Sequence, residues 1–321
     1  MNQFLQSIVP LFVLCGQVLA QTNAVETQRA VWHDSKRDRA VPVKIYSPRT
    51  GSGPFPVILF SHGLGGSRDG YEYLGEYWAS HGYVSVHLQH LGSDDAVWRD
   101  AGLLKGKRAM QKSAANPQNA INRPLDVSFA IDELERLNRD ASPWRHRLDL
   151  DRIGVAGHSF GAFTTLASAG QRFQPGVAKD SSLADPRIKA AIPMSAPTPK
   201  NKSRLDEVYA GVKIPCLHMT GTKDSSPIGD TAAEERRLPF DHCKNSDQFL
   251  ITFKDGDHMI FSGRTTRKNP SDIKFQQLIQ QTSTAFWDAY LRDDPKAKAW
   301  LTNEFEGVLD DAGKFEFRLK R

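Results

Sequence analysis

A serine closely flanked by glycines in the stretch GVAGHSFGAF, residues 154–163, constrains the folding of this chain more than any other feature. Gly157 and Gly161 stand two positions before and two positions after Ser159, although glycine weakens a helix or strand relative to alanine. An apolar run precedes the segment and a helix-compatible run follows it. The pattern is typical of the G-x-S-x-G turn between a strand and a helix, which exposes a nucleophilic hydroxyl above a sheet. The simpler alternative is a glycine-rich turn capped by a serine.

Short runs rich in valine and isoleucine alternate with helix-like segments along the chain. These runs are apolar on both faces, as strands covered on both sides must be, and they predict strands at Val41–Tyr46, Phe55–Phe60, Val84–Leu88, Ile153–Ala156, Ile188–Pro193, Ile214–Met219 and Phe249–Phe253. Apolar residues at helical spacing predict helices at Arg123–Arg139 and Asp272–Leu291. The alternation predicts an α/β fold with a mostly parallel central sheet and helices on both faces.

The beginning of the chain is typical of an exported protein. An apolar stretch from Ile8 to Leu19 is followed by Ala20, so residues 1–20 are predicted to be a signal peptide that directs secretion or export to the periplasm. The stretch is too short for a membrane span, and stable membrane insertion is not expected. We expect residues 21–321 to form a single domain, with a core at about 40–292 and a charged tail at 293–321 in which residues 307–319 form a hairpin.

Charge and cysteine content exclude some functions and leave one question open. The 321 residues include 42 Lys and Arg and 37 Asp and Glu, without a tract of five or more like charges, so nucleic acid is not an expected partner. No histidines or cysteines fall at metal-ligand spacing on one element, and neither a metal nor a cofactor is expected. Cys216 and Cys243 remain after signal removal, and they are either a disulfide or two thiols in the core.

A nucleophilic serine needs a general base, and three histidines follow Ser159 in the sequence. His258 comes shortly after the strand at 249–253, where a loop can carry it to the active-site edge, and we assign it as the base. His218 lies inside a predicted strand and is better explained as a core histidine. His242 lies in a charged stretch that is typical of a surface loop.

The base in turn needs a carboxylate that orients it. Asp224 follows the penultimate predicted strand, the position that this motif requires, and we assign it as the acid. Asp206 and Asp230 remain as rivals. A turn or helix-capping role is the alternative for Asp224.

Acyl transfer also needs N–H donors for the oxyanion that forms in the transition state. One is expected from Phe160, which follows the nucleophile, and the other from Leu64 in the glycine-rich loop SHGLGG at 61–66. The long basic segment 92–122 either walls the site or is mobile. Aromatic residues from nearby loops are candidates for the substrate-binding wall: Tyr71, Trp98 and Phe261.

The motifs together resemble the serine α/β-hydrolases. SHGLGGSRDGYEYLGEYWASHGYVSV, GHSFGA, GTKD and GDHM are similar to segments of bacterial predicted dienelactone hydrolases and of the related platelet-activating-factor acetylhydrolases and polyester hydrolases. The resemblance covers about residues 40–290. It implies the α/β-hydrolase fold, with the nucleophile, base, acid and oxyanion donors at the positions assigned above.

Three departures limit what the resemblance says about substrate. Dienelactone hydrolases use a cysteine nucleophile, whereas this chain has Ser159. The acetylhydrolases take their acid from the loop that corresponds to Met194–Lys200, which here has no carboxylate. Polyester hydrolases usually carry methionine and an aromatic residue where this chain has Phe160 and Leu64.

The sequence therefore predicts an exported carboxylic-ester hydrolase that forms an acyl-enzyme on Ser159 and acts on a small-molecule or polymeric ester. Two alternatives remain: an acyltransferase of the same fold, and a non-catalytic binding protein of that fold. The short stretch 197–212 leaves little room for a cap domain over the site. The sequence does not specify the oligomeric state.

Overall fold

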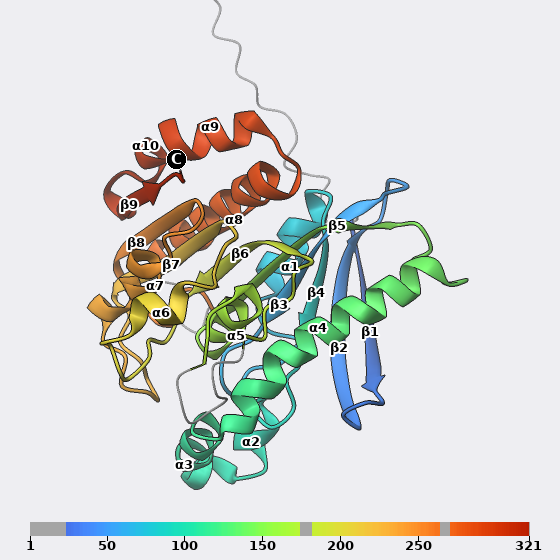
Figure 1. Cartoon of the computed structure of the whole chain (residues 1–321), viewed down its shortest axis with the longest axis horizontal. Helices are drawn as coiled ribbons and strands as arrows, with labels where there is room; N and C mark the ends of the chain where they lie inside the picture. The colour runs from blue at the N-terminus through green and yellow to red at the C-terminus, as the bar shows by residue number, and fades with distance from the viewer. Residues whose placement is uncertain (1–23, 174–181, 264–269, 321) are drawn as a thin grey trace, which may run out of the picture.

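The computed structural model describes residues 24–173, 182–263 and 270–320, which form one mixed β-sheet covered by helices (Figure 1). Within these residues the sheet has nine strands in the order β1-β2-β4-β3-β5-β6-β7-β8-β9. The strands are β1 (Val25–Asp34), β2 (Arg39–Pro48), β3 (Phe55–Ser61), β4 (Val84–Leu88), β5 (Leu148–His158), β6 (Ile188–Met194), β7 (Cys216–Lys223), β8 (Gln248–Asp257) and β9 (Gly313–Arg318).

The centre of the sheet is parallel, which confirms the predicted α/β class. Strands β4, β3, β5, β6, β7 and β8 run in the same direction, and the antiparallel pairs β1–β2, β2–β4 and β8–β9 complete the two edges. All the predicted strands are present, with ends displaced by a few residues. The carboxyl ends of parallel strands meet at one edge, where α/β proteins carry their sites.

Helices cover both faces of the sheet and bury two apolar layers (Figure 1). Successive strand residues point to opposite faces, so Val57 and Leu59 of β3 join the layer under α4, α5 and α6, while Ile58 and Phe60 join the layer under α1, α8, α9 and α10. These helices are α1 (Glu72–Ser80), α4 (Pro117–Arg139), α5 (Phe160–Ala169), α6 (Leu205–Tyr209), α8 (Pro270–Leu291), α9 (Pro295–Asn303) and α10 (Phe305–Leu309).

The end of the chain differs from the predicted hairpin at 307–319. Helix α10 and a short 3-10 turn lead into β9, which pairs antiparallel with β8 as an additional strand of the sheet. Phe315 of β9 is buried in the layer with α8, and this burial explains why the segment adds to the sheet instead of folding on itself. β1 was also missed, because its residues are mostly polar and exposed.

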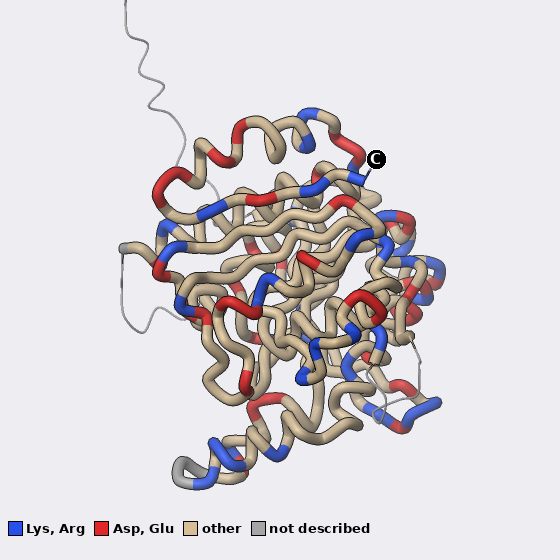
Figure 2. The backbone as a smooth tube through the Cα atoms, turned by 60° about the vertical axis from the view of Figure 1, so that its left-hand side comes forward, with Lys and Arg blue, Asp and Glu red and all other residues tan. Residues whose placement is uncertain are grey.

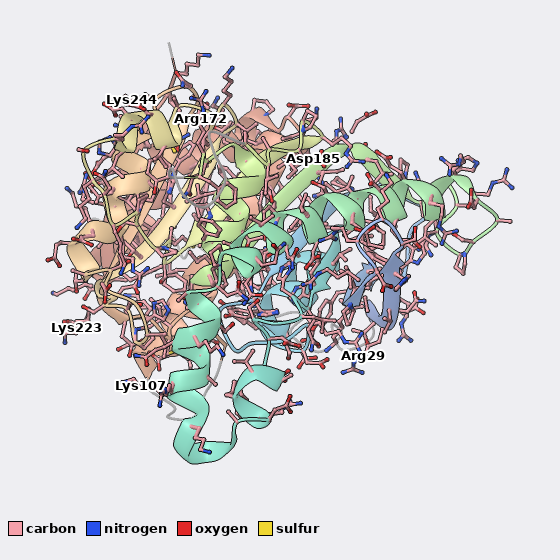
Figure 3. The ribbon with its side chains drawn as sticks, turned by 60° about the horizontal axis from the view of Figure 1, so that its bottom comes forward. Arg29, Lys107, Arg172, Asp185, Lys223 and Lys244 are labelled. Carbon is pink, nitrogen blue, oxygen red and sulfur yellow. The ribbon has the colours of Figure 1, made fainter. Side chains whose placement is uncertain are left out.

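Residues 92–122 are ordered rather than irregular. They form α2 (Ala96–Arg99), α3 (Gly102–Ala114) and the first turn of α4. The indole N–H of Trp98 donates to the Gly65 carbonyl at 2.8 Å, so the segment packs against the glycine-rich loop. Figure 3 shows α3, which carries Lys107, projecting from the body of the molecule.

The N-terminal segment and the distribution of charge were also predicted from the sequence. The predicted signal peptide, residues 1–20, lies outside the described residues. Of the helices in the described part, none has the length and apolarity to cross a bilayer. Basic and acidic residues are interspersed along the described backbone (Figure 2), which agrees with the absence of long like-charge tracts in the sequence.

Candidate active site

Ser159 occupies a strained turn between β5 and α5. Its φ of 56° and ψ of −117° lie in a region that residues other than glycine rarely adopt, and its N–H donates to the Met194 carbonyl at 2.9 Å. A Cβ on Gly157 would lie 2.4 Å from the Gly161 carbonyl oxygen, and a Cβ on Gly161 would lie 1.9 Å from the Ser61 carbonyl oxygen. Both glycines are therefore required by close backbone packing.

Asp224 and His258 meet at the carboxyl edge of the sheet. His258 follows β8 and donates its Nδ1–H to Asp224 Oδ1 at 2.7 Å. Asp224 is fully buried at the end of β7, and its Oδ2 accepts hydrogen bonds from the Ser195 hydroxyl at 2.5 Å and the Thr220 hydroxyl at 2.9 Å. With Nδ1 protonated toward the carboxylate, His258 Nε2 keeps a lone pair that can accept a proton.

The His258 ring lies beside the serine turn. Its centroid is 4.7 Å from that of His158, the residue immediately before Ser159. Burial, followed by the charges of His258 and Arg236, lowers the pKa of His158 well below its usual value, so His158 is neutral. The structure thus gathers the predicted nucleophile, base and acid at one end of β5, β7 and β8.

The rival residues lie elsewhere. His218 is buried and hydrogen-bonded to Gln248 at 2.9 Å, as predicted for a core histidine. His242 pairs with Asp206 at 2.7 Å, and Asp230 pairs with Lys200 at 3.1 Å. None of these contacts involves the serine turn.

The glycine-rich loop at 61–66 lies against the nucleophile turn. A Cβ added to Gly63 would be 3.4 Å from Ser159 Cβ, and Leu64 is the next residue of the loop. The N–H groups of Gly65 and Gly66 are bonded to the Ser93 and Gly63 carbonyls, whereas the Leu64 N–H has no partner among the described residues. Phe160 is the first residue of α5, and an N–H at that position has no partner within the helix.

Arg123 connects the two expected oxyanion donors. The guanidinium is fully buried and donates to the Thr164 and Ser93 hydroxyls, each at 2.8 Å, and to the His62 carbonyl. It also lies 4.6 Å from the centre of the Phe160 ring. Burial lowers the pKa of Arg123 to about 9, which still leaves the side chain charged at neutral pH. The sequence does not indicate this burial, because one arginine within a helical stretch is typical of an exposed helix face.

A second buried arginine, Arg236, touches the His258–Asp224 pair. It donates to the Asp224 carbonyl at 3.1 Å and to the Ser195 carbonyl at 2.8 Å, and its third nitrogen lies 3.4 Å from His258 Nδ1. The residue stands in the charged run Glu234–Arg237, a pattern that resembles a solvated surface. No sequence signal separated it from its exposed neighbours.

Two of the three predicted wall residues are corrected. Phe261 is fully buried beside Phe253 and His158, so its ring cannot reach a substrate. Tyr71 is buried behind the glycine-rich loop, where its hydroxyl contacts His158 Nδ1 at 2.8 Å and accepts from the Gly63 N–H at 3.3 Å. Trp98 is 37% exposed and touches the loop, so it stays a candidate for the wall.

The disulfide prediction is also corrected. Cys216 and Cys243 are both free and buried. Burial raises the pKa of the Cys216 thiol to about 12, and this thiol contacts the Ile214 carbonyl at 3.4 Å. The alternative of two core thiols describes the structure.

Comparison with known proteins agrees with this fold. Residues 17–103 match the family model described as platelet-activating factor acetylhydrolase, isoform II. The platelet-activating factor acetylhydrolase of Canis lupus familiaris is 32% identical over 47% of this chain and 41% of its own length. The platelet-activating factor acetylhydrolase of Bos taurus is 28% identical over 66% of this chain and 49% of its own length. Cutinase 1 of Thermobifida cellulosilytica is 30% identical over 59% of this chain and 55% of its own length.

The fold and these matches support a relationship to the serine α/β-hydrolases. The chain resembles both platelet-activating factor acetylhydrolases and cutinases. It spans about half of the length of these relatives. The similarity to dienelactone hydrolases stays a prediction.

Proposed function

We propose that the protein is a serine carboxylic-ester hydrolase that works through an acyl-enzyme on Ser159. The observation that carries the proposal is the buried 2.7 Å bond between His258 and Asp224, which orients the imidazole beside a strained, partly exposed serine. The names of the relatives, acetylhydrolase and cutinase, support an ester substrate.

In the proposed reaction, the Ser159 hydroxyl transfers its proton to His258 Nε2 while its oxygen attacks the ester carbonyl carbon. The oxyanion that forms accepts hydrogen bonds from the Leu64 and Phe160 N–H groups. The tetrahedral intermediate then breaks the bond to the alcohol, which leaves with the proton from His258. Water attacks the acyl-enzyme with His258 again as base, and the carboxylic acid is released. Asp224 stabilises the imidazolium in both steps.

The test is hydrolysis of p-nitrophenyl esters from acetate to palmitate by the wild type and by Ser159→Ala. We expect turnover by the wild type and a loss of about 10⁶-fold in the variant. Ser168→Ala is the matched control, because Ser168 is a buried serine of α5 whose hydroxyl has no hydrogen-bond partner in the described structure. Equal turnover by Ser159→Ala would refute the proposal, and release that requires an added alcohol would indicate acyl transfer instead.

Export is a separate part of the proposal, supported by the apolar stretch at the start of the sequence. Cleavage after Ala20 predicts that protein recovered from the periplasm or the medium begins at Gln21. N-terminal sequencing of the recovered protein checks this. A chain that keeps residues 1–20 and stays in the cytoplasm would contradict export without affecting the esterase proposal.

A further inference from the structure

The 3-10 helix at Ala233–Arg237 places a guanidinium inside the active-site edge of the sheet. Arg236 is only 3% exposed. It donates to the carbonyls of Ser195 and Asp224, which follow the neighbouring strands β6 and β7. One side chain therefore joins the two loops that surround the acid.

The same guanidinium lies beside the base and the acid. One of its nitrogens is 3.4 Å from His258 Nδ1, and Nε is 3.5 Å from Asp224 Oδ1. Because His258 Nδ1 already donates its hydrogen to Asp224, the arginine cannot donate to that atom as well. The contact is thus a buried positive charge against the ring, in a place where solvent and salt screen little.

Several groups facing His258 influence its protonation. Asp224 favours the imidazolium, since it is an opposite charge in direct contact, while Arg236 opposes it as a like charge at short range. His158 packs against the ring but is neutral, because burial lowers its pKa. Asp257, the preceding residue, is exposed and caps the Met259 N–H.

We propose that Arg236 is a positioning residue of the His258–Asp224 pair, and that its charge keeps His258 free of a second proton down to lower pH than the aspartate alone would allow. This inference rests on the proposed function. Arg236 has no direct part in bond making: it fixes the two loops through their carbonyls and biases the base toward its active, neutral form.

The pH dependence of kcat/KM for p-nitrophenyl acetate tests the inference. Arg236→Met removes the charge, and we expect the acid limb of the profile to move about 1 pH unit toward higher pH. Arg236→Lys keeps the charge but loses the two-carbonyl geometry, so its acid limb should stay near that of the wild type while kcat falls. A purely structural role would lower kcat in both variants without moving the limb.

Arg237→Met is the matched control. Arg237 is the next residue and pairs with Asp241 and Glu316, away from His258. Its loss should leave the acid limb in place. If Arg236→Met does not fold, as judged by circular dichroism, Arg236→Gln replaces it, since glutamine still offers an amide donor to the Ser195 carbonyl.

The outcomes separate the two proposals. An acid limb that does not move in the folded neutral variant, or the failure of both neutral variants to fold, overturns the role assigned to the charge of Arg236. A wild-type protein that hydrolyses no ester, or an active Ser159→Ala variant, overturns the proposed function itself.

Discussion

Replacing Arg123 by methionine should separate stability from catalysis at the glycine-rich loop 61–66, which we propose to supply an oxyanion donor. The guanidinium is completely buried in α4 and binds the His62 carbonyl and two hydroxyls while stacking on Phe160. Methionine fills much of the same volume but offers no donor. The loop that carries Leu64 then loses its buried anchor.

The cost in stability should be moderate. Each hydrogen bond from a charged donor contributes about 1.5–3 kcal/mol, but removing the buried charge also removes its desolvation cost. The two hydroxyls keep other partners, because Thr164 donates to the Phe160 carbonyl and Ser93 donates to the His90 carbonyl. The His62 carbonyl alone is left without its donor, and we expect a net loss of about 2 kcal/mol.

The cost in catalysis should be larger. Misplacing one oxyanion donor lowers kcat by about 10²–10³-fold, and a released loop misplaces the Leu64 N–H. We therefore expect kcat for p-nitrophenyl acetate to fall at least about 100-fold, with a smaller change in KM. Urea unfolding followed by circular dichroism gives the stability change on the same protein samples.

Arg136→Met is the control for this experiment. Arg136 lies on the same helix, is 50% exposed on its side chain, and pairs with Glu133 and Asp140 at the surface. Surface pairs of this kind contribute about 0–1 kcal/mol, so stability and kcat should both stay close to the wild type. A folded Arg123→Met protein with wild-type kcat would refute the assignment of Arg123 as the anchor of the loop.

Three further predictions test packing, pH dependence and the thiols. Gly161→Ala puts a methyl group 1.9 Å from a backbone carbonyl oxygen and should lower the free energy of unfolding by at least about 3 kcal/mol, as measured in urea. Gly307→Ala has open space around the added methyl group and should not destabilise the protein. Equal effects of the two substitutions would contradict the close packing at Gly161. Burial lowers the pKa of His87 to about 3, so unfolding takes up a proton below the ordinary value of 6.5 and stability falls as the pH drops from there toward 3. His87→Phe should therefore reduce the slope of unfolding free energy against pH in this range by about 1.4 kcal/mol per pH unit. The same substitution at the exposed His81 should leave the slope unchanged. An unchanged slope in His87→Phe would contradict the burial of a neutral His87. Both buried cysteines should react with a thiol reagent only after unfolding, and the recovery of a disulfide from the native protein would contradict the two free thiols.

The sequence was sufficient for the parts of the fold that depend on local pattern. Parallel strands buried on both faces need continuous apolar runs, and each such run proved to be a strand. The turn at Ser159 could be predicted because close packing allows only glycine at positions 157 and 161. Asp224 and His258 could be chosen because each follows a strand at the edge where parallel strands end.

The remaining parts depend on contacts between distant segments. Arg123 and Arg236 look like ordinary helix charges, and their burial arises from loops far away in sequence. Tyr71 and Phe261 both contact His158 but are buried, because position along the chain does not determine whether a ring faces the cleft or the core. The edge strand β9 was missed because its single buried face is formed by residues of a charged tail.

The most direct test of the central claim is a rapid-mixing measurement of p-nitrophenol release, followed by mass spectrometry of the trapped protein. A nucleophilic Ser159 held beside the His258–Asp224 pair predicts a burst of about one equivalent of product and an acyl group on the peptide that contains Ser159. Two results would contradict Ser159 as the nucleophile. One is steady release of p-nitrophenol, without a trapped acyl group, under conditions where hydrolysis of the acyl-enzyme is slow. The other is an acyl label on any other residue.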